Sequence, residues 1–386
     1  MSLKERYIQL AGSTKDNVDR TVLAKSHAVV REIVKGVLKV GGGLVVGVGE
    51  DLRLETANPD SARLFDWTVL DEVERFSRAS GELGQKMVQP GAVVVTSQKN
   101  LGRIPEARRA AWEYLVGSNA IAVRPLEVDW SAAAYIRVHQ AAAGHGLVIL
   151  GGGEGVEHAA SLYVERGRVV VPLDADLGSF YGDGTGGARR LYHYALSKPE
   201  RFVLRDAQTY CNALQLTSMA GTAEATVVAS RVIELLARFA TPTAFCVRLL
   251  DPSSANFNSV QNFFDNTIRP GLTELGFQDI EMGRTPATEG FMNLEIFQSL
   301  HYVDVAVADL TDLRHNNFLE AGYALGRPLP VIFTAMDGTK LPFDTHAIPT
   351  FFWKADEPDV TRRKKFLEHW NLYVNRASLV RRRELG

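Results

Sequence analysis

The sequence predicts an α/β protein made of two Rossmann-like or flavodoxin-like domains with mainly parallel sheets. Three observations support this fold class. Short apolar strands alternate with helical stretches along the whole chain, which is typical of parallel sheets with crossover helices. Most glycine clusters adjoin a strand end, where the backbone can turn tightly and approach a ligand closely. The 386 residues exceed what one core usually supports, so two domains are expected.

The first half contains a regular series of predicted elements. Each strand is a short apolar run, and the segment between two strands has helical spacing or length. We expect strands at Tyr7–Ala11, Leu44–Val48, Ala92–Thr96, Ala120–Val123, Gly146–Leu150 and Arg168–Pro172, with helices near Val18–Val40, Thr68–Ala79, Ile104–Val116, Trp130–Ala143 and Val156–Arg166.

A domain boundary is expected where a helical region meets a proline. Ala207–Ala240 has apolar residues at helix spacing, and A-T-P-T at Ala240–Thr243 ends it because proline lacks an amide hydrogen. We therefore expect a first domain at 1–206, a helical linker at 207–242 and a second domain at 243–386. The second domain should have strands at Ala244–Leu250, Gln278–Met282, Val303–Ala308 and Pro330–Phe333, and helices at Val260–Leu275, Asn293–Leu300, Asn317–Leu325 and Asp359–Asn375.

The bulk composition excludes several classes of protein. A net charge of −2 gives no basic field for nucleic acid. Two cysteines, Cys211 and Cys246, fit a reducing compartment, and scattered histidines give no metal site. We see no signal peptide and no apolar run near the ~20 residues that span a bilayer. We expect a cytoplasmic protein without membrane, nucleic-acid or cofactor partners.

Glycine-rich loops in the first half are candidates for binding a nucleotide. Each follows a strand, and backbone amides at a strand–helix junction suit phosphate. The alternative is that these glycines only permit tight turns and close packing. A further cluster, Gly182–Arg190, ends in two arginines that suit a diphosphate but are equally well explained as surface charges. The candidate residues are Gly12, Ser13, Gly47, Gly49, Gly152, Gly153, Glu154, Gly155 and Arg189.

The first 200 residues resemble the SLOG superfamily, the Smf/DprA and LOG group of Rossmann-like folds. The motifs are Y-I-Q-L-A-G-S-T at Tyr7–Thr14, G-G-G-L-V-V-G-V-G-E at Gly41–Glu50 and L-G-G-G-E-G-V-E-H at Leu150–His158. The likeness is greatest to the branch found beside sirtuin and TIR effectors in bacterial defence proteins. The superfamily's hydrolases carry P-G-G-x-G-T-x-x-E, but Ala159 stands at the Glu position here. The resemblance therefore implies nucleotide sensing without hydrolysis.

Glu320 is the candidate catalytic residue of the second half. Cleavage of an N-glycosidic bond passes through an oxocarbenium-like sugar, which a carboxylate stabilises or attacks. Glu320 follows a strand, an acidic turn and a helix start, a layout that aims it at the ligand edge of a parallel sheet. Ordinary alternatives exist: Glu320 as a solvated charge, Asn316 as a helix cap and Asp309 as the partner of Arg314. The candidate substrate-binding residues are Asp309, Thr311, Asn316 and Asp251.

Phe245–Phe333 resembles the nucleoside 2-deoxyribosyltransferase-like and TIR-like families. The family pattern a-D-L-T-x-x-N-x-N-x-x-x-E-x-G-x-A corresponds to A-D-L-T-D-L-R-H-N-N-F-L-E-A-G-Y-A at Ala308–Ala324, and L-P-F-D at Leu341–Asp344 also fits. The resemblance implies that Glu320 is catalytic and that Asp309 and Asn316 line the site. Arg314-His315-Asn316 departs from the usual Asn-Pro-Asn, and Leu319 replaces a common aromatic residue, which leaves the substrate open.

Three functions remain open on these grounds. The first is an antiphage defence effector, a homo-oligomer whose SLOG-like domain senses an ADP-ribose-type nucleotide and whose TIR-like domain hydrolyses NAD⁺. The second is a 2-deoxyribosyltransferase or N-glycosidase acting on nucleosides or nucleotides. The third is a receptor that binds nucleotides without turnover. Fold-level analogy alone does not decide among them.

Overall fold

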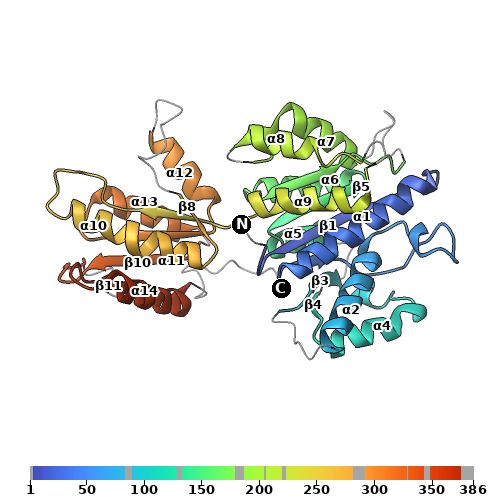
Figure 1. The fold of residues 1–386 in the computed structure, drawn as a ribbon, viewed down its shortest axis with the longest axis horizontal. Helices are drawn as coiled ribbons and strands as arrows, with labels where there is room; N and C mark the ends of the chain where they lie inside the picture. Colours follow the sequence, from blue (N-terminus) through green and yellow to red (C-terminus); the bar gives the residue numbers. More distant parts are fainter. Residues whose placement is uncertain are drawn as a thin grey trace. The chain divides into compact units, whose positions relative to one another are not determined.

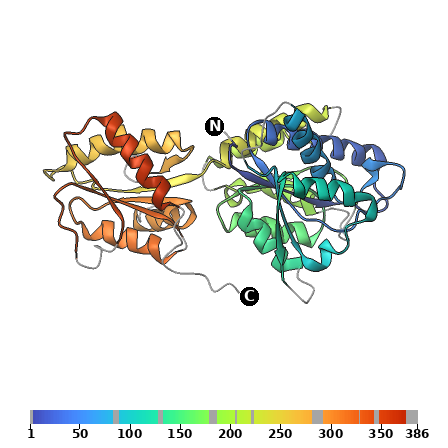
Figure 2. The ribbon, with the colours of Figure 1, turned by 90° about the horizontal axis from the view of Figure 1, so that it is seen from below.

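The chain forms two compact α/β units, at Met1–Ala240 and Thr241–Gly386. The structure is a computed structural model that describes residues 3–82, 89–127, 133–178, 187–203, 206–219, 223–280, 292–327, 329–342 and 348–374. Both units have a parallel sheet with helices on its two faces (Figures 1 and 2), which confirms the predicted fold class. Among the described residues, no helix combines the length and the apolar character needed to cross a membrane.

The first unit is built on a sheet of six strands in the order β4-β3-β2-β1-β5-β6. All neighbouring strands within it run parallel. Their interiors are almost continuously apolar and buried, as expected for strands covered on both faces. The strands are β1 (Tyr7–Ser13), β2 (Gly43–Val46), β3 (Ala92–Ser97), β4 (Ile121–Leu126), β5 (Gly146–Gly151) and β6 (Val169–Leu173).

Helices cover the two faces of this sheet. Figure 2 shows α1, α2 and α9 on one face and α5 and α6 on the other. The longest described helix, α1, begins after Asp19, whose carboxylate accepts hydrogen bonds from the amides of Thr21 and Val22. The helices are α1 (Arg20–Lys39), α2 (Asp66–Glu82), α3 (Gln98–Leu101), α4 (Glu106–Gly117), α5 (Ala133–Ala143), α6 (Glu154–Val164), α7 (Gly187–Ser197), α8 (Ala207–Gln215) and α9 (Ala225–Phe239), with short 3₁₀ turns η1 (Pro59–Ser61) and η2 (Pro199–Arg201).

The helices of 207–242, the region expected as a linker, contribute to the core of the first unit. Val228, Val232, Leu235 and Leu236 of α9 are all buried. Gly36 of α1 allows the close approach of α9, because a Cβ at this position would lie 2.1 Å from the side chain of Ile233. The chain therefore leaves the first unit at Ala240, where α9 ends.

The second unit has a sheet of five strands in the order β11-β10-β9-β7-β8. Its neighbouring strands are parallel, in the strand order of flavodoxin-like folds. The elements are β7 (Thr243–Val247), α10 (Phe257–Phe263), the π-helical turn η3 (Phe264–Ile268), α11 (Arg269–Glu274), β8 (Gln278–Ile280), α12 (Met292–Tyr302), β9 (Val305–Asp309), α13 (His315–Gly326), β10 (Val331–Met336), β11 (Thr350–Trp353) and α14 (Asp359–Tyr373).

Two apolar clusters fill the two faces of the second sheet. One contains Phe263, Trp353 and Phe366 under α10, α11 and α14, and the other contains Phe245, Leu300 and Phe333 under α12 and α13. Phe263 stacks on Trp353 with a ring distance of 4.3 Å and an interplanar angle of 10°. In Figure 2 the two helix groups lie above and below the sheet. Helix α13, with Glu320, therefore occupies one face beside the carboxyl ends of the strands.

Candidate functional site

In the first unit, two glycine loops meet where the strand order reverses. β1 lies between β2 and β5, so the chain turns to opposite sides after β1 and after β5. Gly12 is level with Leu150, and Ser13 with Gly151, in the register of β1 and β5. The reversal point of an open parallel sheet is the usual position for a ligand crevice.

Close packing is the reason for several of these glycines. A Cβ on Gly12 would lie 1.9 Å from the carbonyl oxygen of Leu150. Gly151 has a φ of +60°, and a Cβ there would lie 2.3 Å from the carbonyl oxygen of Ser13. The amide of Gly152, which has a φ of +75°, donates to the same oxygen of Ser13 at 2.9 Å. Gly12, Ser13 and Gly152 thus join the two strand ends directly.

The loop after β2 is held by the start of α2. The amide of Gly47 donates to Oδ1 of Asp66 at 3.0 Å, and the carbonyl of Gly49 accepts from Nε1 of Trp67 at 3.1 Å. Burial raises the pKa of Asp66. A Cβ on Gly49 would meet nothing closer than 3.9 Å, from Asn100, so this glycine is in a more open position than Gly12.

The amino end of α6 carries the candidate residues Gly153, Glu154 and Gly155. Gly153 precedes the helix and Glu154 is exposed. The guanidinium of Arg137 on α5 lies against this turn, because a Cβ on Gly155 would be 3.3 Å from its Nη1. Arg137 Nε donates to Nδ1 of His158 at 3.0 Å, and burial lowers the pKa of Arg137.

Arg189 is engaged with the loop after β6. Its Nε lies 3.2 Å from Asp174 and its Nη1 lies 3.5 Å from Asp176. Ala159, which aligns with the motif glutamate of the hydrolases in the superfamily that the sequence resembles, is buried in the core. Residues 182–186 of the glycine–arginine cluster lie outside the described residues.

The second unit has its own reversal point, between β7 and β9. The loop after β7 contains Asp251, and the loop after β9 leads into α13. An ion pair between Asp251 and Arg314 joins these loops, and the hydrogen bonds from Ser253 and Arg314 lower the pKa of Asp251 to about 2. Asp312 also accepts hydrogen bonds from Ser254 and from Asn256, the latter at 2.7 Å.

Asp309 and Thr311 form hydrogen bonds at the carboxyl end of β9. Asp309 is 1% exposed and accepts from the amide of Thr311 at 3.1 Å, from Thr334 at 2.8 Å and from Trp353 at 3.0 Å. Burial raises the pKa of Asp309, against the effect of these hydrogen bonds. The hydroxyl of Thr311 accepts from the amide of Met336. The two side chains that were expected to contact a sugar thus hold neighbouring strands together.

Glu320 lies on the second turn of α13 and is half-buried. No hydrogen bond or ion pair joins it to another side chain in the described part of the chain, and burial raises its pKa to about 7. Asn316 is exposed one turn earlier on the helix, at the i, i+4 spacing that brings two side chains together. The structure therefore gathers Asn316 and Glu320 on one stretch of helix surface.

Two further polar residues of this turn form buried or loop-ordering hydrogen bonds and were not among the candidate site residues. Asn317, rather than Asn316, is the buried amide of the pair, and its Nδ2 donates to the carbonyl of Asp309 at 2.9 Å. Asp312 is the acceptor that orders the loop after β7. Both residues lie in the stretch that leads from β9 into α13, which is rich in Asp and Asn. The L-P-F-D run reaches past Pro342 into residues outside the described part.

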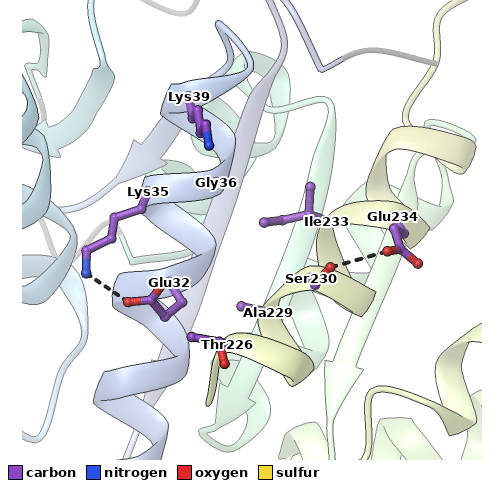
Figure 3. Close-up of a pocket in the computed structure, with 9 residues that line it drawn as sticks. All are labelled: Glu32, Lys35, Gly36, Lys39, Thr226, Ala229, Ser230, Ile233 and Glu234. Carbon is purple, nitrogen blue, oxygen red and sulfur yellow. Dashed lines mark hydrogen bonds and ion pairs between the residues drawn. The ribbon is translucent and has the colours of Figure 1, made fainter. Parts of the chain in front are cut away.

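Among the described residues, no group of three His, Cys, Asp or Glu side chains is arranged to hold a metal ion. Two hollows lie elsewhere among the described residues, on helices of the first unit. Figure 3 shows one between α1 and α9, where Lys35 pairs with Glu32 and Ser230 donates to Glu234.

Comparison with known proteins gives a family match for the first unit. Residues 3–236 match the family described as ATP nucleosidase Cap17-like, N-terminal. Two curated relatives named ATP nucleosidase Cap17, from Escherichia coli and its strain KTE188, are 28% identical over 190 residues. The match covers 49% of this chain, and the chain spans 36% of the length of these relatives.

Two solved structures are also similar at a low level. DNA processing protein A from Helicobacter pylori, solved for its single-stranded DNA binding mode, aligns with 55% of this chain and 81% of its own, at 12% identity and a TM-score of 0.30. The C-terminal domain of glucosamine-fructose-6-phosphate aminotransferase from Francisella tularensis aligns with 95% of this chain and 82% of its own length. The identity is 13% and the TM-score is 0.18. Neither TM-score is high enough to support a conclusion about this chain. The sequence match over more than half of its residues does show that the chain belongs to the ATP nucleosidase Cap17-like, N-terminal family.

Proposed function

We propose that the second unit is an N-glycosidase that cleaves the bond between base and ribose in a nucleotide, with Glu320 as its catalytic carboxylate. One observation carries the proposal. Glu320 is half-buried, has no hydrogen-bonding or ionic partner among the described residues, and has a pKa raised to about 7. A carboxylate in such surroundings beside the ligand edge of a sheet is a candidate functional group.

The chemistry follows from the charge that develops in the substrate. As the N-glycosidic bond breaks, the sugar acquires oxocarbenium character, and an adjacent carboxylate stabilises that positive charge or adds to the anomeric carbon. A partly desolvated carboxylate interacts more strongly with a developing cation than a solvated one does. Asn316, exposed one helical turn away, supplies an amide for a sugar hydroxyl.

The substrate that we favour is NAD⁺, cleaved between nicotinamide and ribose, because nicotinamide leaves as a neutral base. ATP is the second candidate, and the name of the two relatives, ATP nucleosidase, favours it. The family match ends at residue 236 and does not include Glu320, so it supports a nucleosidase role for the whole protein rather than for this residue. We propose that the protein acts as a defence effector.

For the first unit we propose nucleotide sensing at the glycine-bearing edge of its sheet. Ala159 provides no carboxylate where the hydrolases of the superfamily that the sequence resembles have one, which favours binding over turnover. The open position of Gly49 and the amino end of α6 beside Arg137 are suited to a phosphate-bearing, ADP-ribose-type ligand. In this scheme binding promotes assembly of a homo-oligomer, and assembly activates the second unit.

The decisive experiment compares products. The purified chain is incubated with NAD⁺, ATP or 2′-deoxyadenosine, with and without a panel of ADP-ribose nucleotides, and released bases are identified by mass spectrometry. We expect Glu320→Gln to abolish base release. Glu274→Gln, a surface change on α11 where Glu274 pairs with Arg363, is the matched control and should retain activity. Unchanged turnover in the Glu320→Gln variant would eliminate the assignment.

The same assay separates the other functions. Base exchange or release from 2′-deoxyadenosine alone identifies a deoxyribosyltransferase or deoxynucleoside hydrolase. Tight nucleotide binding without turnover by any assembled form identifies a non-catalytic receptor.

A further inference from the structure

Asn317 lies within one helical turn of Glu320 and attaches the start of α13 to the sheet. Its side chain is buried, and Nδ2 donates to the main-chain carbonyl of Asp309, the last residue of β9, at 2.9 Å. A side-chain amide that projects from a helix and bonds a strand fixes the two elements relative to each other. The bond therefore sets the height and the rotation of the first turn of α13 at the carboxyl end of β9.

The residue that accepts this bond, Asp309, is a rigid point of the sheet. Its own carboxylate is buried and accepts hydrogen bonds from Thr311, Thr334 and Trp353. These partners belong to the turn after β9, to β10 and to β11, so Asp309 cannot move without breaking bonds to several elements. A helix tied to such a point is held more precisely than one tied to a loop.

Helix geometry places Glu320 on the side of α13 that Asn317 anchors. The buried residues Asn317, Ala321 and Ala324 follow at i, i+4 and i+7 and form the stripe that faces the sheet. Glu320 lies three residues after Asn317 and four before Ala324, at the margin of that stripe, which agrees with its half-buried state. Leu319 points away from the stripe and is 62% exposed. A shift of the first turn would therefore move the Glu320 carboxylate towards solvent.

The turn before α13 is strained and depends on contacts at both of its ends. Leu313 has a φ of +50°, a left-handed conformation that leucine rarely adopts and that persists where neighbouring contacts fix the backbone. On one side, the carboxylate of Asp312 is bonded to the loop after β7. Arg314, which precedes the helix, has only donor groups and cannot accept from the amides of the first turn. The bond from Asn317 to the end of β9 is the contact that holds the other side.

We propose that Asn317 is a positioning residue for the catalytic carboxylate, because its bond to the carbonyl of Asp309 holds Glu320 at the carboxyl end of the sheet. Asn317 acts through Glu320 and does not contact the substrate. This inference rests on the glycosidase proposed for the second unit and adds the group that positions its carboxylate.

The test compares Asn317→Leu with the unmodified chain in the base-release assay, with NAD⁺ and ATP as probes. Leucine has the branched shape of asparagine but no donor, so the packing is retained and the bond to Asp309 is lost. Displacement of the carboxylate should lower kcat about tenfold, while KM changes by less than about twofold because the contacts that bind the substrate remain. Asn371→Leu, at an exposed position of α14, is the matched control and should leave both constants unchanged.

The pH profile of kcat separates a positioning role from a general loss of structure. Burial raises the pKa of Glu320 to about 7, so a carboxylate displaced towards solvent should ionise at lower pH. The midpoint of the profile should therefore fall to about pH 6 in Asn317→Leu and stay at the unmodified value in Asn371→Leu. Partial unfolding lowers the amplitude of the profile without moving this midpoint. Urea denaturation of both variants measures the folded fraction under assay conditions.

Glu320→Gln, measured in parallel, separates failure of the positioning role from failure of the glycosidase assignment. If Glu320→Gln loses base release while Asn317→Leu keeps the original kcat and pH midpoint, the positioning role is overturned and the assignment of Glu320 stands. If Glu320→Gln retains full turnover, both are overturned. A higher KM at constant kcat also overturns the positioning role, because it would make Asn317 a substrate-binding residue. A lower kcat, a constant KM and a lower midpoint together support it.

Discussion

In the second unit, the carboxylate of Asp309 accepts a hydrogen bond from the indole Nε1 of Trp353 at 3.0 Å. Asp309 ends β9 and Trp353 ends β11, and β10 lies between these strands. The same carboxylate oxygen accepts from the hydroxyl of Thr334 on β10 at 2.8 Å. One side chain therefore joins the carboxyl ends of three strands, at the edge where α13 begins.

Asp309→Ala should consequently lower stability rather than substrate affinity. The change leaves the indole of Trp353, the hydroxyl of Thr334 and the amide of Thr311 without their acceptor in a buried place. We expect a loss of about 2–4 kcal/mol in the free energy of unfolding, measured by urea denaturation. Asp356→Ala, at an exposed position, should change it by less than about 0.5 kcal/mol. An unaffected midpoint in the Asp309 variant would contradict a structural role.

The order of strands and helices followed largely from local sequence. β1 begins at Tyr7 as predicted, and α1 covers nearly the expected segment, because long periodic patterns and buried apolar runs are local signals. β11 was not predicted. Its four residues, T-F-F-W, are too few to show a period, and they form a strand through pairing with β10.

The surroundings of site residues depend on contacts that no local pattern contains. The sequence singled out Asp309, but its burial depends on Thr334 and Trp353, which are 25 and 44 residues away. The raised pKa of Glu320 likewise reflects packing around α13. Asn316 and Asn317 are neighbours on α13 and therefore point in different directions from the helix. Asn317 points inward and donates to the carbonyl of Asp309, a difference that the local sequence does not reveal.

The pH dependence of base release should follow the ionisation of Glu320. Stabilising a developing cation requires the carboxylate, and the pKa of Glu320 is raised to about 7. Activity should therefore increase as pH rises through about 7 and level off above about pH 8, with one ionisable group controlling the rise. Initial rates at saturating substrate between pH 5 and 9 test this. A rate that falls over the same range would assign Glu320 the role of a general acid instead.

The contribution of Glu320 to the free energy of unfolding should decrease as pH rises, whereas its contribution to activity should increase. The folded-state pKa of Glu320 is higher than its ordinary value of 4.5, so folding favours the protonated form. The associated stability is fully present below about pH 4.5 and is lost as pH rises through 7. Glu320→Gln should therefore be more stable than the wild type at pH 8 by about 1–2 kcal/mol, after allowance for solvent screening, and nearly equal at pH 4.5. Urea unfolding at the two pH values measures the difference.

Asp312 should affect substrate binding through the loop after β7. Its carboxylate holds Ser254 and Asn256, and the adjacent pair of Asp251 with Arg314 joins the same two loops. Asp312→Ala removes two hydrogen bonds and frees the loop, so we expect KM to rise about fivefold with kcat within about twofold. Asp312→Asn keeps one acceptor and should recover most of the loss. Steady-state kinetics with both variants distinguish this positioning effect from a catalytic one, which would lower kcat.

Gly12 is the position at which a single methyl group should do most damage to the first unit. An added Cβ would lie 1.9 Å from the carbonyl oxygen of Leu150, and the atom it meets belongs to the backbone of β5, which cannot rotate away. Gly12→Ala must therefore separate β1 from β5, and we expect a destabilisation of at least about 3 kcal/mol. Gly81 is the matched control, because a Cβ near the end of α2 meets nothing within 4 Å. Gly81→Ala should stabilise the unit by about 0.5–1 kcal/mol, since alanine loses less conformational freedom in a helix. Thermal unfolding of both variants measures the contrast, and equal unfolding temperatures would contradict the close contact of the two strands at Gly12.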